Sequence, residues 1–250
     1  MNKQKNGPRK FLTKFKINTI KTYPMKATVF CLLIVLVVSA GCVTEDTDSN
    51  NDNAYSFHNI ITVTVFWIGE EGNEDNGFIP NIQSAWDDNW LQHYGGVDDP
   101  NNRNGYVPTN FTPSENPFYC ALPYNDFSED GERKSNAYDV VYWSTEHTWD
   151  DSESMCKNRW IKITKNDKTA YAQWEDVGPF GEDDTVYVFN DALPSNDRNN
   201  KAGLDVSPAV RDYLKLNDID TVNWHFVDFS EVPDGPWKNI ITISQITWNE

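Results

Sequence analysis

Short apolar runs, many in period-two alternation, dominate the chain after residue 55 and predict strands. The runs are rich in β-branched and aromatic residues, and Gly, Asn, Asp and Pro separate them. Residues 165–168 (KNDK) are typical of a turn that joins two of the runs into a hairpin. The expected strands are residues 60–67, 118–123, 159–164, 169–174, 186–189, 222–227 and 240–246.

Two short helices are expected among these strands. Residues 84–93 place Trp86, Trp90 and Leu91 on one helical face. Residues 207–214 begin with Ser207 at the N-cap and Pro208 at the first helical position, where the missing N–H costs nothing. About seven strands and two helices indicate a mainly β fold.

Residues 69–117 are rich in Gly, Asn, Asp and Pro, with little sign of regular structure. A segment of this length is unusual as a plain loop in a compact domain. Because Trp, Tyr and Phe recur along it, we expect an ordered, packed insertion.

The first 41 residues have a different character. They contain eight basic residues, no Asp or Glu, and an apolar run at 27–40. The run is shorter than the roughly 20 residues that span a bilayer. A basic flank with a short apolar core is typical of an export signal. Translation from Met25 would still give a complete signal.

The end of this signal, Ser39-Ala40-Gly41-Cys42, resembles the lipobox of lipoproteins, although Ser39 stands where Leu is usual. The resemblance implies that Cys42 carries a lipid anchoring the protein to a membrane. A cleaved signal without lipid, or an uncleaved anchor, are the alternatives. All three predict an extracellular or cell-envelope location.

Residues 42–54 are almost entirely polar and predict a flexible tether. The remaining residues, 55–250, have the length of one domain. Eight of the 21 basic residues lie in the signal, which leaves 13 against 38 acidic residues and a net charge of −25.

This charge excludes nucleic acid and anionic membrane surfaces as partners, because phosphate binding needs a basic face. The acidic clusters lack the spacing of a calcium loop, and no His/Cys cluster has zinc spacing. We therefore expect no metal and no cofactor, and interpret the charge as an aid to solubility. A monomer is expected.

Cys120 and Cys156 are the two cysteines within the domain. In an exported chain they most simply form one disulfide; two buried free thiols are the alternative. The chain also has ten Trp. Such rings either fill the core or stack on sugars, and core use is the default for any single one.

Three segments resemble, in order, the double-psi β-barrel superfamily, which includes rare lipoprotein A, the expansins, barwin and family-45 glycoside hydrolases. Residues 120–123 (CALP), followed by Cys156, resemble the Ala-Leu and Cys positions of expansins. Residues 174–180 (WEDVGPF) resemble the Asn-Asp-Arg-Gly-Pro-Phe signature of rare lipoprotein A. Residues 203–209 (GLDVSPA) resemble its Ile-Asp-Leu-Ser stretch and the His-Phe-Asp-Leu-Ser of expansins.

The resemblance covers about 60–67 and 118–229 and implies a six-stranded double-psi β-barrel. Asp176 matches the catalytic Asp of rare lipoprotein A, a lytic transglycosylase. Asp205 matches the expansin Asp, which corresponds to the general acid of family-45 hydrolases. Both would face one groove, where cleavage of a glycosidic bond needs a proton donor and hydrolysis a second carboxylate. Each Asp could also be structural; Asp205 lies just before a helix N-terminus.

The match departs from the family at its histidines. Rare lipoprotein A pairs a His with its catalytic Asp, whereas the corresponding stretch here has Asn125 and Asp126 in that space. The His before the expansin Asp is also missing. Four aromatic residues are candidates for sugar stacking: Tyr124, Trp143, Tyr171 and Trp174. Tyr171 and Trp174 point to opposite faces of a strand, so at most one of them is expected to stack on a sugar.

Three functions follow as hypotheses. The first is an expansin-like envelope protein that binds cell-wall or extracellular polysaccharide in the barrel groove, which the missing His favours. The second is a glycan-cleaving enzyme, a lytic transglycosylase or glycoside hydrolase, with Asp176 as general acid/base and Asp205 assisting. The third is an acidic envelope scaffold.

Overall fold

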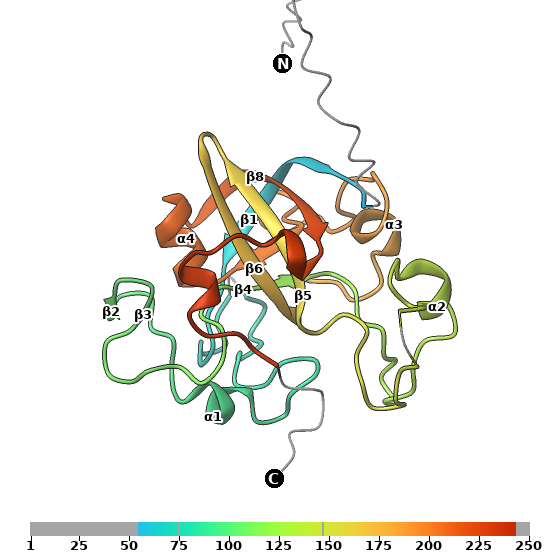
Figure 1. Cartoon of the computed structure of the whole chain (residues 1–250), viewed down its shortest axis with the longest axis horizontal. Coiled ribbons are helices and arrows are strands. Elements are labelled where there is room, and N and C mark those ends of the chain that lie inside the picture. The colour runs from blue at the N-terminus through green and yellow to red at the C-terminus, as the bar shows by residue number, and fades with distance from the viewer. Residues whose placement is uncertain (1–54, 75, 147, 244–250) are drawn as a thin grey trace, which may run out of the picture. The chain divides into compact units, whose positions relative to one another are not determined.

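The computed structural model describes residues 55–74, 76–146 and 148–243, and a closed barrel of six strands forms the centre of this part (Figure 1). Neighbours β1–β7 and β4–β6 are parallel and the other four pairs antiparallel. The predicted mainly β fold with a six-stranded barrel and few helices is confirmed. Around the barrel the strand order is β1 (His58–Val65), β7 (Leu204–Val206), β4 (Tyr119–Leu122), β6 (Lys168–Val177), β5 (Arg159–Lys165) and β8 (Ile219–Val227).

The predicted export signal (1–41), the lipid on Cys42 and the tether (42–54) lie outside the described residues. Within the described ranges, no helix has both the length and the apolarity to cross a membrane.

Two local predictions are confirmed by the backbone. The hairpin of β5 and β6 turns at Asn166, whose φ is 53°. Helix α4 (Pro208–Leu214) begins after Ser207, whose Oγ accepts a hydrogen bond from Val210 N at 3.3 Å. That bond satisfies one of the free N–H groups of the first helical turn.

Three local predictions are wrong. Residues 186–189 lie in helix α3 (Thr185–Val188) and at its end, and the consecutive Tyr187 and Val188 are both buried, which defeats a period-two interpretation. The helix expected at 84–93 shortens to α1 (Trp90–Tyr94), because the Asp87 side chain accepts from Asn89 N and forms a turn.

No strand forms over 240–243, the described part of the expected last strand. Side chains hold this segment instead: Gln173 bonds both the N–H and the C=O of Thr242, at 2.9 and 3.0 Å. The remaining elements are α2 (Ala137–Val140), the two-stranded ladder of β2 (Arg103–Asn104) and β3 (Val107–Pro108), and the 3-10 helices η1 (Phe229–Glu231) and η2 (Pro236–Lys238).

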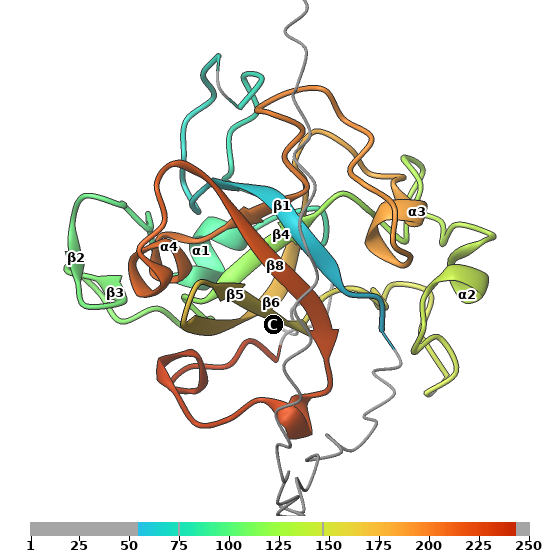
Figure 2. The ribbon, with the colours of Figure 1, turned by 90° about the horizontal axis from the view of Figure 1, so that it is seen from above.

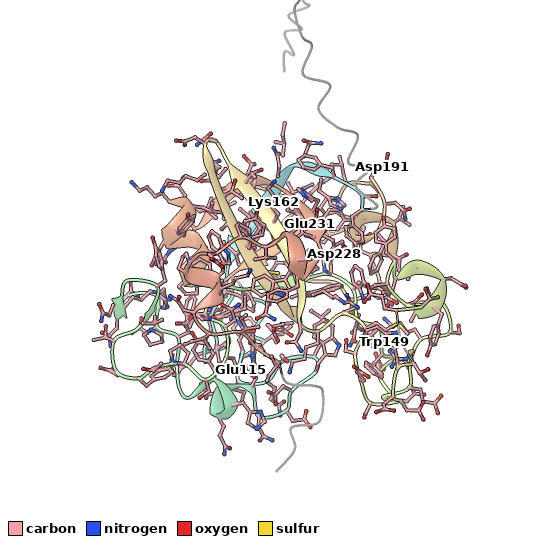
Figure 3. All side chains as sticks on the ribbon, viewed as in Figure 1. Glu115, Trp149, Lys162, Asp191, Asp228 and Glu231 are labelled. Atoms are coloured by element: carbon pink, nitrogen blue, oxygen red, sulfur yellow. The ribbon has the colours of Figure 1, made fainter. Side chains whose placement is uncertain are left out.

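Two apolar clusters support this architecture, and side chains fill the space between the elements (Figure 3). The larger one, the main core, occupies the barrel interior and contains Trp174, Trp224 and Phe226. The smaller one, the insertion core, lies between residues of β4 and the insertion. It contains Phe66, Ile68, Trp90, Tyr94, Tyr119 and Ala121.

A buried ion pair adjoins the insertion core. Arg103 donates to one carboxylate oxygen of Asp98, and Tyr119 Oη donates to the other at 2.9 Å. The same Tyr119 hydroxyl accepts from Ile68 N at 3.0 Å. Burial raises the pKa of Asp98, while the Arg103 charge opposes that rise. The network links the insertion to β4 and to the chain leaving β1.

Candidate functional site

Four residues on neighbouring strands form one cross-strand row. Ala121 of β4 is the register partner of Asp176 on β6 and of Asp205 on β7, and Asp205 is in turn the partner of Thr64 on β1. Residues in register point to the same face of a sheet. The two aspartates are therefore separated by one strand that carries only a methyl group between them.

A β-bulge aims Asp176 at this face. The β4–β6 pairing shifts between Cys120, opposite Trp174, and Ala121, opposite Asp176, so that Glu175 is an extra residue. Trp174 consequently packs in the main core while Asp176 lines a groove. Bulges commonly redirect a side chain in this way. Simple alternation along the strand would have placed Trp174 and Asp176 on the same face.

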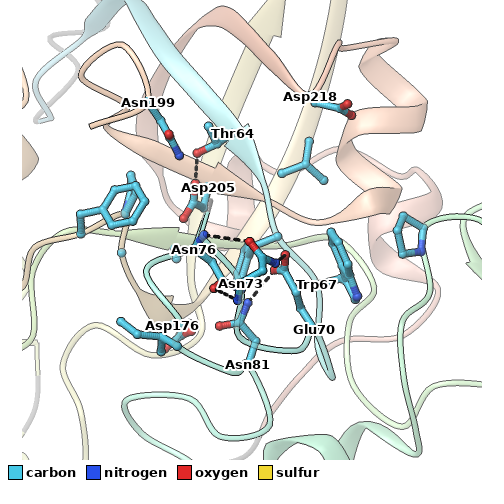
Figure 4. A pocket seen from close by; sticks show the side chains of 18 of the residues that line it. Thr64, Trp67, Glu70, Asn73, Asn76, Asn81, Asp176, Asn199, Asp205 and Asp218 are labelled. Atoms are coloured by element: carbon cyan, nitrogen blue, oxygen red, sulfur yellow. Dashed lines mark hydrogen bonds between the residues drawn. The ribbon is translucent and has the colours of Figure 1, made fainter. Parts of the chain in front are cut away.

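The groove above this row has a volume of about 540 Å³ and collects the aspartates from the two motifs (Figure 4). One wall comes from the barrel strands and the loop after β6, the other from the insertion. Its polar lining includes Thr64, Glu70, Asn73, Asn76, Asn81, Asn101, Asp176, Asn199, Asp205, Arg211 and Asp218.

Each of the two aspartates has a carboxylate oxygen held by the protein. Asp176 Oδ1 accepts from Val177 N and from Ala85 N of the insertion, both at 2.8 Å. Asp205 Oδ1 accepts from the Thr64 hydroxyl, and a Cβ placed on Gly178 would be 3.5 Å from Asp205 Oδ2. Burial is the main reason that the pKa of both carboxyls rises from 3.8 to about 7.

The insertion wall of the groove begins with a turn that only glycine accommodates well. Gly69 has φ of 82°, and a Cβ there would lie 2.8 Å from Val97 Cγ2. The turn directs Glu70 into the groove, where Asn81 Nδ2 donates to Glu70 Oε2 at 3.0 Å. Burial raises the pKa of Glu70 as well.

Trp67 and Phe180 are partly exposed aromatic residues that line the groove. Neither was predicted from the sequence as a binding residue. Phe180 has φ of 54°, unusual for a bulky residue, and Arg198 lies over its ring at 5.0 Å. Trp67 follows β1 and lies near Glu70 in the groove (Figure 4). Each of the two lies two residues from a glycine, Gly69 or Gly178, that is typical of a turn. This proximity was the signal in the sequence that could have identified them.

The aromatic residues predicted to stack on sugars need correction. Tyr124 and Trp174 are fully buried, and Trp143 and Tyr171 are 3 % and 8 % exposed. None of the four lines the groove. Their rings fill the main core, because burying such large apolar side chains stabilises the fold more than exposing them to a ligand would.

Asn125 and Asp126 are also outside the groove. Asn125 Oδ1 accepts from Trp86 Nε1 and Phe127 N, both at 3.0 Å. The buried Asp126 carboxylate accepts from Arg133 at 2.8 Å and from Ser154 Oγ at 2.7 Å. Both residues organise loops, and neither takes part in the groove.

The predicted disulfide is absent, and the alternative of two buried free thiols is what the structure contains. The two thiols lie in different buried surroundings. The Cys120 thiol on β4 is near Glu175 and Asp205, whereas the Cys156 thiol is near Asp126. Burial raises the pKa of both thiols well above the usual range, which makes them poor nucleophiles.

Glu175, the extra residue of the bulge, is 1 % exposed. Burial raises its pKa and the nearby Lys157 opposes the rise. Among the residues described, no group of three or more His, Cys, Asp or Glu is arranged to hold a metal ion.

No protein-family model matches this sequence, and no curated protein matches it either. The chemistry of the groove is therefore the basis for assigning a function.

Proposed function

We propose that this chain is an exported protein of the double-psi β-barrel superfamily that binds a polysaccharide in its groove and cleaves a glycosidic bond there. The observation that carries the proposal is the pairing of Asp176 and Asp205 on either side of Ala121. The closed, mixed six-stranded barrel and the position of both motifs at one groove support the superfamily assignment.

The hydrogen bonds support different roles for the two carboxyls. Two backbone N–H groups donate to Asp176, and such bonds favour the charged form. Asp205 receives only the Thr64 hydroxyl among its hydrogen bonds in the described structure. The coupling is mutual, since a charge on Asp205 raises the pKa of Asp176. From the hydrogen bonds we infer that Asp205 holds the proton and Asp176 the charge when the pair carries one proton.

The reaction follows from that assignment. Asp205 gives its proton to the glycosidic oxygen as the bond to the anomeric carbon breaks. A water molecule attacks that carbon, and Asp176 takes the proton that the water loses. Two strand spacings separate the Cα atoms by about 10 Å. The inverting mechanism we propose requires that the two carboxyl groups leave room for the attacking water between them.

Polysaccharide binding without cleavage, as in expansins, is the second candidate. It is favoured by one observation: no histidine is among the residues that line the groove in the described part of the chain. Trp67, Phe180 and the groove asparagines would serve both functions, since they offer ring faces and hydrogen bonds to sugar hydroxyls.

Incubation of the purified chain with insoluble cell-wall glycans tests the proposal when soluble sugars and the bound fraction are measured together. We expect release from one glycan class, with products of inverted anomeric configuration by NMR. Asp176→Asn should lower the release by about 10²–10⁴-fold and leave binding intact. Binding without release would support the second candidate, and anhydro-sugar products would contradict the role of water.

A further inference from the structure

Charged side chains join the two walls of the groove where helix α4 meets the insertion. Arg211 of α4 and Pro100 of the insertion both line the groove, and the Arg211 guanidinium donates to Pro100 O at 3.1 Å. Beside this contact, Asp212 pairs with Arg211 at 2.8 Å and with Arg103 of the insertion at 3.5 Å. Such a network holds its side chains better than an isolated surface pair does. Protein therefore spans the space between the walls at this end, and we call the contact the helix bridge.

A second contact between the walls involves the loop that precedes β7. A Cβ placed on Gly77 of the insertion would lie only 2.9 Å from Arg198 Nη1 and 3.9 Å from Phe180 Cε1. The Arg198 guanidinium lies over the Phe180 ring at 5.0 Å, within the range of a cation–π contact, and Phe180 lines the groove. Gly77, Arg198 and Phe180 thus form a continuous contact from one wall to the other, the loop bridge.

The two bridges lie at opposite ends of the groove. Figure 4 shows Asn199, which follows Arg198 in the chain, on one side of Thr64 and Asp218, which follows α4, on the other.

The aspartate pair lies between the bridges, nearer to the loop bridge. A Cβ on Gly178, two residues before Phe180, would be 3.5 Å from Asp205 Oδ2. Trp67 lies farther along the groove, toward the side of Asp218 (Figure 4). A polymer cleaved at an internal bond extends from the aspartates in both directions, and would have to leave the groove at both ends. Because protein spans both ends, a chain terminus fits this site and an internal segment does not.

We propose that the groove admits only the end of a glycan chain, so that cleavage removes short sugars from chain ends and leaves internal bonds intact. The cleavage step rests on the proposed function. Recognition of a chain end rests on the two bridges, and binding alone can test it.

The binding test uses cellohexaose, chitohexaose and xylohexaose, each with free ends and with a bulky substituent on both terminal sugars. Calorimetric titration of Asp205→Asn measures affinity without turnover. We expect the blocked form of a hexasaccharide to bind about tenfold more weakly than its free form, because it cannot enter far enough to contact Trp67. Equal affinity of the free and blocked forms would overturn the proposal, even if the wild type cleaves glycan.

Viscometry gives a separate readout of cleavage, with hydroxyethylcellulose, glycol chitin and arabinoxylan as soluble polymers. Released sugar should rise while the viscosity of the polymer stays nearly constant, because chain ends alone are shortened. An early fall in viscosity would overturn the proposal and leave the proposed cleavage standing. Weaker binding of blocked ligands by a chain that releases no sugar would sustain chain-end recognition and overturn the cleavage alone.

The double variant Arg198→Ala, Arg211→Ala removes the bridging side chains from both ends. Its matched control is Lys201→Ala, Lys215→Ala, which removes two exposed cations close to them in the chain and outside the groove. The bridge variant should gain about tenfold in affinity for the blocked hexasaccharide, and the control should gain nothing. A bridge variant that unfolds like the wild type and gains no affinity would overturn the proposal. If the bridge variant does not fold, the comparison of free and blocked ligands decides.

Discussion

The barrel and the insertion each build one wall of the groove, but they position their residues by different means. In the barrel, strand register places Asp176 and Asp205 on either side of Ala121, above the large main core. In the insertion, the ladder β2–β3 and the short helix α1 contribute little regular structure, and the insertion core is small. A buried ion pair, Asp98–Arg103, adjoins it.

The two walls should therefore fail separately. Many backbone hydrogen bonds together fix the register of two paired strands, so the substitution of one side chain changes the register little. The insertion depends on a few buried polar contacts, each of which is costly to break. Since Ala85 N and Glu70 both come from the insertion, its loss would alter the carboxyls without opening the barrel. Figure 2 shows the barrel strands and the loops of the insertion from a second direction.

The largest effect is expected from breaking the ion pair of the insertion. Arg103→Met leaves the Asp98 carboxylate buried without its positive partner, and should lower the free energy of unfolding by about 3–5 kcal/mol. Urea denaturation measures this change. Lys238→Met removes a cation that lies 4.0 Å from an exposed Asp234 and should cost less than about 1 kcal/mol. Equal small losses in both variants would show that the insertion does not depend on the pair.

The second prediction concerns the barrel wall and pH. The folded-state pKa of about 7 for Asp176 and Asp205 lies above the unfolded value of about 3.9. The folded state therefore binds more protons between these values, and stability falls as pH rises from about 4 to 7.

The double variant Asp176→Asn, Asp205→Asn should flatten that slope, as measured by the free energy of unfolding at a series of pH values. Part of the slope should remain in the double variant, because the buried acids Asp98 and Asp126 also have raised pKa values. A slope that is unchanged in the double variant would contradict the assignment of buried, protonated carboxyls to the groove.

The smallest of the three effects is expected on ligand binding at the junction of the walls. Trp67→Ala removes a partly exposed ring from the groove and should weaken glycan binding by about tenfold. Phe229→Ala is the control, because Phe229 is 52 % exposed but lies outside the groove. Co-sedimentation with insoluble glycan measures both, and an equal loss in the two variants would exclude a specific role for Trp67.

Local signals in the sequence predicted much of the barrel. The KNDK turn, the Ser207 cap and the β-branched runs act over a few residues, and each is found in the structure. The motif aspartates were selected by resemblance, and both line the groove. Short runs were harder: residues 186–189 have a strand-like composition but fold as part of a helical turn, because tertiary packing decides over so few residues.

The rest of the groove could not be predicted because it depends on contacts between distant segments. The bulge at Glu175 is a property of the pairing with β4, and it separates Trp174, in the core, from Asp176, in the groove. Ala85 N reaches Asp176, and Glu70 enters the groove, only after the insertion has folded against β4. Polar residues in a loop-rich segment carry no sign of such contacts.

Release of soluble sugar by Asp205→Asn, compared with wild type on the same insoluble glycan, tests whether Asp205 donates the proton in the cleavage. We expect release to fall by about 10²–10⁴-fold while the bound fraction and the thermal transition are retained, because only the proton donor is lost. Release at the wild-type rate would contradict the assignment of Asp205 as the acid. Binding with no release by the wild type would contradict cleavage itself.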